Sequence, residues 1–322
     1  MSWLSDWPRC RRAALFATIV WVCAALGLLL AAALAVGKVK WGYPEPRADK
    51  NWEVDDWRSD QCETLHRDSV VRERQNTWSN LAYLDAGILV LFRARRVLPV
   101  FFGVALCALA GTSGMYHASV TGFWQTADIF GVYCVLLGLN CLAGEALWRS
   151  QGGGGNPLTG YAVTCAVVTP LLSFAAAHWR GDTVVVLGIS LLDSTVVFIV
   201  MVVALVALLT LSLVSEQVAA NRKQKHSDLS ANRFFLGCGH ILDHVGMFMF
   251  YVLVTAAPAF VLRLMDGTNG DGSTKDLCSP DGMLGFLQAH ATWHVLSALA
   301  LLLAYDLFAR VTRDDSRIFS DD

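Results

Sequence analysis

Long apolar runs dominate the sequence, and eight of them approach the length of a membrane-spanning helix. A helix needs about 20 predominantly apolar residues to cross a bilayer. Across the 322 residues, 55% are hydrophobic and only 16% are charged, which is outside the range of ordinary soluble domains. We therefore predict an all-α polytopic membrane bundle. The expected spans are Ala13–Val36, Ser79–Phe92, Pro99–Tyr116, Trp124–Leu147, Leu158–Ala177, Thr183–Val214, Phe234–Leu262 and Met283–Ala309.

Three of these runs are less clear as single membrane-spanning helices. The second, Ser79–Phe92, is long enough only if Asn80 and Asp85 are buried inside the bundle. The sixth, Thr183–Val214, is long enough to tilt strongly or to contain a break. The first follows arginines, as a signal peptide would, but its length favours a retained anchor.

Lysines and arginines form four clusters between or beside the runs, and their positions predict the orientation. With eight spans, all four clusters lie on one side of the membrane, which should be the cytosol. Both termini are then cytosolic, and residues 38–78 and 263–282 form loops on the outer or lumenal side. The totals of 25 basic and 27 acidic residues argue against a nucleic-acid partner. The clusters are Arg9, Arg11 and Arg12; Arg93, Arg95 and Arg96; Arg222, Lys223, Lys225 and Arg233; and Arg310, Arg313 and Arg317.

Five polar residues are expected near the outer ends of three spans. Ser113 and His117 lie late in the third span, Asp128 lies early in the fourth, and His290 and His294 lie two to three turns into the eighth. Residues four apart share a helix face. Three imidazoles from two helices supply three nitrogens and leave a fourth position open, which is the pattern of a catalytic zinc site.

Such a site predicts a hydrolase for an amide or an ester. A zinc ion activates water and polarises a carbonyl. Asp128 is placed to act as the general base, and Ser113 to donate a hydrogen bond to the oxyanion. Each residue also has a simpler interpretation: a histidine hydrogen-bonded within the bundle, an acidic residue at a helix N-terminus, or a small residue at a helix contact.

A second histidine pair occurs in the seventh span. The stretch HILDH places His240, Asp243 and His244 within one turn of each other, near the cytosolic face. This position is at the opposite depth from His117, so the two groups cannot share an ion. We interpret the trio as a polar contact between helices, with a proton or substrate path as the alternative.

Three segments together resemble the alkaline ceramidases, which belong to a superfamily of seven-helix membrane hydrolases. These segments are GTSGMYHAS with Asp128 eleven residues after His117, QAHATWHVLSAL, and CETLHRDSVVRERQNTWSNL. The resemblance implies that His117, His290 and His294 bind zinc, with Ser113 and Asp128 as catalytic partners. It further implies cleavage of the ceramide amide into a sphingoid base and a fatty acid.

The same resemblance implies a calcium site and a disulfide. The calcium ligands correspond to Asp60, Glu63 and Glu73, whose carboxylates are the hard oxygen ligands that Ca²⁺ prefers. The sequence departs from the family at Gln61, where the family has tryptophan, and has no clean match for the family's next asparagine. The disulfide corresponds to Cys62 and Cys278, both on the side expected to be oxidising.

The eight spans and the resemblance together divide the chain, and the first span departs from the family, which typically has seven helices. Residues 1–40 form a cytosolic tail and an extra transmembrane anchor, residues 41–309 form the seven-helix ceramidase-like domain, and residues 310–322 form a cytosolic tail. The endoplasmic reticulum or the Golgi is the expected membrane, with the active site toward the lumen. The alternatives are a receptor-like or lipid-remodelling member of the superfamily that acts on or binds other acyl lipids, and a transporter or scaffold that needs no metal.

Overall fold

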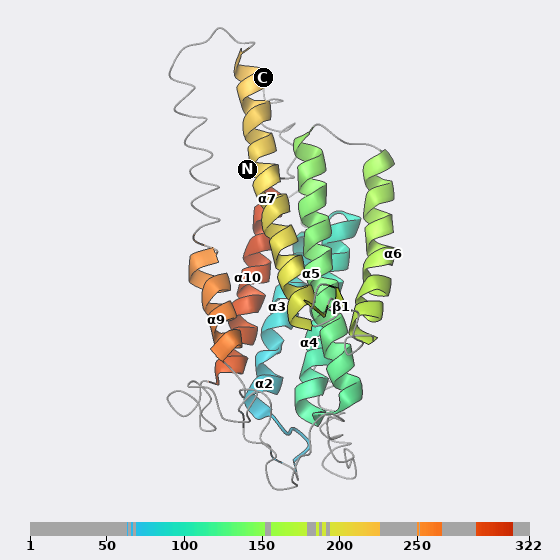
Figure 1. Cartoon of the computed structure of the whole chain (residues 1–322), viewed down its shortest axis with the longest axis vertical. Helices are drawn as coiled ribbons and strands as arrows, with labels where there is room; N and C mark the ends of the chain where they lie inside the picture. The colour runs from blue at the N-terminus through green and yellow to red at the C-terminus, as the bar shows by residue number, and fades with distance from the viewer. Residues whose placement is uncertain are drawn as a thin grey trace, which may run out of the picture.

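The computed structural model describes Glu63, His66, Phe250 and residues 69–151, 156–178, 185–186, 189–190, 194–225, 252–265 and 288–311. These residues form a bundle whose helices run along one long axis, with a single short pair of antiparallel strands (Figure 1). The elements are α2 Arg74–Ser79, α3 Leu81–Arg93, α4 Val97–Ser119, α5 Gly122–Ser150, α6 Asn156–His178, β1 Val185–Val186, β2 Ile189–Ser190, α7 Ser194–Lys225, the π-helix η1 Val252–Ala256, α9 Ala257–Met265 and α10 Ala289–Val311.

Four of the described helices, α4, α5, α6 and α10, are long and apolar enough to cross a membrane. A helix of 23 residues, the length of α4, extends about 34 Å at 1.5 Å per residue, which matches a hydrocarbon layer of about 30 Å. These helices confirm the third, fourth, fifth and eighth predicted spans, although α10 is described only from Ala289. The first predicted span lies outside the described residues.

Two of the predicted spans are not single helices long enough to span a membrane. The second corresponds to the 13-residue α3, because only its first residue, Ser79, belongs to α2, and Asn80 separates the two helices. Asn80 is buried, as that span requires, but Asp85 is exposed. The sixth is not one helix, because β1 and β2 precede α7, which begins at Ser194.

The described end of the seventh predicted span contains a π-helix. The π-turn of η1 ends at Ala256, two residues before Pro258, which lies in the first turn of α9. Proline has no N–H, and its ring collides with the carbonyl oxygen four residues earlier, so a regular α-helix cannot continue through it. The wider π-turn accommodates this defect.

The core of the bundle lies between α3, α4, α5 and α10. Its largest fully buried side chains include Phe102, Leu106 and Leu139. Helices α3 and α4 approach closely through Gly87 and Gly103, since a Cβ atom at Gly87 would lie 2.9 Å from the carbonyl oxygen of Gly103. Small residues at helix contacts are typical of membrane bundles.

The outer faces of α6 and α7 carry large exposed apolar side chains, which suit contact with lipid chains. They include Val163, Val167, Leu171, Phe174, Val200 and Val203. In water such a surface would be an aggregation liability. Together with the four spanning helices, it indicates a membrane protein.

Ion pairs tie together one end of the bundle, which we call the arginine end. Arg96, just before α4, pairs with the buried Glu145 of α5, and Arg149 pairs with the same carboxylate at 3.0 Å. Arg93 at the end of α3 pairs with Asp306 of α10 at 2.6 Å. Since α4 runs from the arginine end and α10 runs toward it, the last turns of α4 and the first turns of α10 lie together at the opposite end.

A tight reversal joins α4 and α5 at that opposite end. Val120 closes α4 in the left-handed conformation with φ of 48°, and its N–H donates to the carbonyl oxygen of Tyr116. A positive φ is unusual for a β-branched residue. The reversal allows α5 to begin at Gly122, which places Asp128 in its second turn, at the same end of the bundle as His117.

Candidate metal centre

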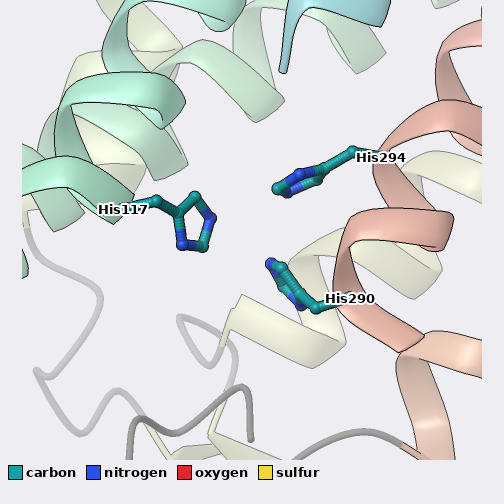
Figure 2. Close-up of side chains that lie close together, drawn as sticks. All are labelled: His117, His290 and His294. Atoms are coloured by element: carbon teal, nitrogen blue, oxygen red, sulfur yellow. The ribbon is translucent and has the colours of Figure 1, made fainter. Parts of the chain in front are cut away.

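Three buried histidines meet at the end opposite the arginines. His117 comes from α4, and His290 and His294 come from the first two turns of α10. Their exposed fractions are 1%, 4% and 1%, and one ring nitrogen from each lies within 4.8 Å of the others. Figure 2 shows the three rings pointing toward one another from the two helices. The structure thus brings together the three residues that the sequence predicts as metal ligands.

Glu73 orients the imidazole of His117. Its Oε2 lies 2.5 Å from Nδ1 of His117, and both side chains are 1% exposed. Because a carboxylate accepts hydrogen bonds, Nδ1 is the nitrogen that carries the proton. Nε2 is then left with a lone pair to offer to a metal. A carboxylate behind a metal-binding histidine is the usual way in which proteins fix the tautomer of such a ligand.

Backbone hydrogen bonds place Glu73 beside this histidine. The N–H of Arg72 donates to Ala118 O and the N–H of Glu73 donates to His117 O, each at 3.1 Å. The guanidinium of Arg72 also donates to Ser119 O at 2.8 Å. The last carbonyl groups of a helix have no partner within the helix. The segment before α2 supplies partners for the end of α4, and this contact brings Glu73 into the site.

Ser79 orients His294 in the same way. Its Oγ lies 2.7 Å from Nδ1 of His294 and donates its own proton to Asn76 O at 2.9 Å. Nδ1 of His294 must therefore be the donor, which again leaves Nε2 for a metal. The short segment from Glu73 to the end of α2 orients ligands on both α4 and α10. The sequence prediction did not include this role for either residue.

The two predicted catalytic residues, Ser113 and Asp128, differ in burial. Ser113 is buried and lies one turn before His117 on the same helix. Asp128 is partly exposed and interacts electrostatically with Tyr83. The ring of Tyr83 packs edge-on against His294, with centroids 5.7 Å apart. Asp128 therefore lies at the same end of the bundle as the histidines but is not a member of their cluster.

Buried oxygen atoms gather between Glu63, Glu73 and Asn76. The carboxylate of Glu63 accepts the backbone N–H groups of Gln75 and Asn76 at 2.7 and 2.9 Å, at the beginning of α2. Oε1 of Glu73 and Oδ1 of Asn76 are buried and accept no hydrogen bond from the described residues. The cluster therefore has more acceptors than donors, as a cation site does.

Opposing effects act on the pKa of Glu63 in this cluster. Burial raises the pKa of Glu63, and the nearby charge of Glu73 raises it further. The N–H groups of Asn76 and Gln75 lower that pKa, and so does His117. Burial outweighs them, because desolvation disfavours the charged carboxylate. A cation at this position would stabilise both carboxylates in their charged form.

Several predicted residues lie outside the described part of the chain. They are the calcium ligand Asp60, the cysteines Cys62 and Cys278, and the trio His240, Asp243 and His244. The predicted calcium site, disulfide and second histidine pair therefore remain sequence-based predictions at these positions.

Ser79→Ala is expected to weaken metal binding by about 10- to 100-fold, the usual cost of losing a partner behind a ligand. The imidazole of His294 would lose the acceptor that fixes its tautomer. Titration of the metal-free protein with zinc measures the affinity. Ser150→Ala is the matched control, because Ser150 makes the same type of bond to a carbonyl three residues earlier, at the arginine end. Equal zinc affinity in both variants would show that His294 does not depend on Ser79.

The chain was compared with protein-family models and with curated proteins, and neither comparison finds a match. The likeness to alkaline ceramidases therefore depends on the sequence motifs alone. Any function has to be inferred from the geometry of the histidine centre and its surroundings.

Proposed function

We propose that this chain is a zinc-dependent membrane hydrolase that cleaves the amide bond of ceramide, giving a sphingoid base and a free fatty acid. One observation carries the proposal: three buried histidines from two helices offer nitrogens within 4.8 Å of one another. Buried imidazoles so close together are costly in an apolar bundle unless they have a function.

The donor set fits zinc. Tetrahedral zinc with Zn–N bonds of about 2.0–2.1 Å places its ligand nitrogens about 3.3 Å apart. The three histidines approach that arrangement. Glu73 and Ser79 engage Nδ1 of His117 and His294, so Nε2 is the nitrogen that each ring would offer to a metal. Three protein ligands are the number found in catalytic zinc sites, where the fourth position is left for water or substrate.

The neighbouring side chains supply the remaining chemistry of amide hydrolysis. Bound zinc would lower the pKa of a water molecule and polarise the substrate carbonyl. Asp128 accepts the proton from the attacking water and later donates it to the leaving nitrogen as the C–N bond breaks. The hydroxyl of Ser113, one turn from His117, donates a hydrogen bond to the oxygen that becomes negative. Glu73 and Ser79 keep the ligand rings in position throughout.

The surroundings of the centre favour a lipid substrate over a polar one. A cavity of about 230 Å³ lies between α4, α5, α7, α9 and α10, and most of its lining is aliphatic or aromatic. It reaches Trp293, whose ring centroid is 5.1 Å from that of His294. A cavity of this kind accommodates a hydrocarbon chain. The likeness of the motifs to alkaline ceramidases selects ceramide among such lipids.

The positions of the charges support a lumenal centre. Arg96 precedes α4 and His117 lies 21 residues further along, which is about 30 Å in a helix. Positive residues beside spans favour the cytosolic side. The arginine end then faces the cytosol, and the histidines face the lumen of the endoplasmic reticulum or the Golgi.

The oxygen cluster supports calcium as a second ion. Glu63 and Glu73 are buried close together, with Oε1 of Glu73 and Oδ1 of Asn76 lacking donors among the described residues. Calcium binds six to eight such oxygens. Asp60 would complete the set implied by the family resemblance.

Metal analysis combined with lipid product analysis tests the proposed function. We expect about one zinc per chain in the purified protein and release of a sphingoid base from ceramide. Release of fatty acid from acyl-phospholipids without any sphingoid base from ceramide would reject the ceramidase assignment and keep the hydrolase. A protein that contains no stoichiometric metal would instead be a scaffold or a transporter.

A further inference from the structure

A pair of hydroxyl groups lies in the otherwise apolar cavity beside the histidines. The hydroxyls of Tyr83 on α3 and Ser297 on α10 are 2.5 Å apart, and both residues line the cavity. Most other lining residues are aliphatic or aromatic, such as Leu109, Val135 and Phe198. Tyr83 is only 2% exposed. Polar groups inside such a cavity determine the orientation of whatever binds there.

The hydrogen bonds of this pair leave only acceptor positions unused. Ser297 Oγ donates to the carbonyl oxygen of Trp293 at 2.6 Å, so its single proton is committed. The proton between the two hydroxyls must then come from Tyr83. Each oxygen keeps a lone pair, and neither has a second proton to give. A ligand that satisfies this pair must therefore be a hydrogen-bond donor.

The pair lies at the end of the cavity nearest the metal centre. The ring of Tyr83 packs on His294, and Ser297 lies one turn after His294 on the same face, with its Oγ 3.2 Å from the His294 carbonyl oxygen. Asp128 interacts electrostatically with Tyr83. A donor bound here would belong to the part of the lipid close to the scissile bond, not to the far end of a chain.

We propose that Tyr83 and Ser297 form a specificity site that recognises a lipid hydroxyl close to the scissile amide; the inference rests on the proposed function. In an N-acyl lipid the nearby donors are the amide N–H and any hydroxyl of the sphingoid base or the acyl chain. The N–H is common to every amide substrate, so only hydroxyls allow discrimination. Sites built to bind a hydroxyl reject analogues that lack it, because their polar groups stay unpaired.

The test compares lipids that differ by single hydroxyls. The panel contains a ceramide, its 3-deoxy and 1-deoxy analogues, and the same ceramide with a 2-hydroxyacyl chain, so each arm identifies one source of the hydroxyl. We expect the wild type to prefer one hydroxylated member by at least about tenfold in kcat/KM. Tyr83→Phe and Ser297→Ala should each reduce that preference to about twofold or less.

Two measurements separate recognition from a structural role. Tyr83→Phe keeps the ring that packs on His294, so zinc content should match that of the wild type. Tyr305→Phe is the control, because Tyr305 is a buried tyrosine of α10 that is not among the residues lining the cavity. This variant should keep the full preference. An unchanged preference in both Tyr83→Phe and Ser297→Ala would overturn the inference, and so would a wild type that treats all four lipids alike.

Binding of the same lipids distinguishes this inference from the proposed function. The fluorescence of Trp293 and the other tryptophans reports lipid binding whether or not the amide is cleaved. A wild type that hydrolyses none of the lipids would reject the proposed function alone. The hydroxyl preference in the dissociation constants would then decide the role of the pair, with the same two variants expected to lose it.

Discussion

In the proposed zinc hydrolase, His290→Ala is expected to remove the zinc and abolish hydrolysis, because the centre would lose one of its three clustered imidazole nitrogens. His117 and His294 remain, but two imidazoles do not retain a catalytic zinc ion. Loss of a partner behind a ligand costs about 10- to 100-fold in affinity or activity, and loss of the ligand itself costs more than that. Zinc content of the purified variant and release of sphingoid base from ceramide measure the two effects.

His178→Ala is the control for this variant. His178 ends α6, is exposed, and stacks on Phe174 with centroids 5.8 Å apart. Removing it changes the histidine count by the same amount without touching the cluster, so zinc content and turnover should equal those of the wild type. Full zinc content in His290→Ala would mean that the zinc is held elsewhere in the chain.

The histidine cluster could be predicted because helical periodicity and topology both constrain it. His290 and His294 are four residues apart, so one face of α10 carries both. His117 lies near the end of α4, and antiparallel helices bring that end beside the start of α10. Neither step requires knowledge of side-chain contacts. The structure confirms that the three rings lie together.

The sequence alone could not predict that Glu73 and Ser79 orient the histidine rings. Glu73 contacts His117 across 44 positions, and Ser79 contacts His294 across 215. Such pairs have no periodicity, and the Glu73 pair depends on hydrogen bonds between the segment before α2 and the end of α4. The family resemblance singled out Glu73, but as a calcium ligand. The structure shows the same carboxylate with one oxygen on His117 and the other buried near Glu63.

Hydropathy predicted helices well where one apolar run forms one regular helix, as in α4, α5 and α6. It failed where the backbone departs from the α-helix inside an apolar run. The strands β1 and β2 are as apolar as the helix that follows them, so hydropathy did not separate them from α7. The π-turn before Pro258 was likewise hidden, because the wider turn does not alter the apolar composition.

Asp128→Asn is expected to reduce turnover by about 10²- to 10⁴-fold, the usual contribution of a general base or acid, while zinc stays bound. The amide of asparagine has nearly the same shape as the carboxylate but does not accept a proton from water. Asp128 is not among the three residues of the cluster, so the ion should not depend on it. Steady-state turnover of ceramide and zinc content, measured on the same preparation, separate catalysis from metal binding.

Asp85→Asn provides the matched control, because Asp85 is an exposed carboxylate on another helix, α3, and its replacement should have no effect on turnover. If the variant keeps full turnover, the proton must pass to another group at the centre. Glu73 is the first to consider, since its second oxygen is buried without a hydrogen-bond donor among the described residues.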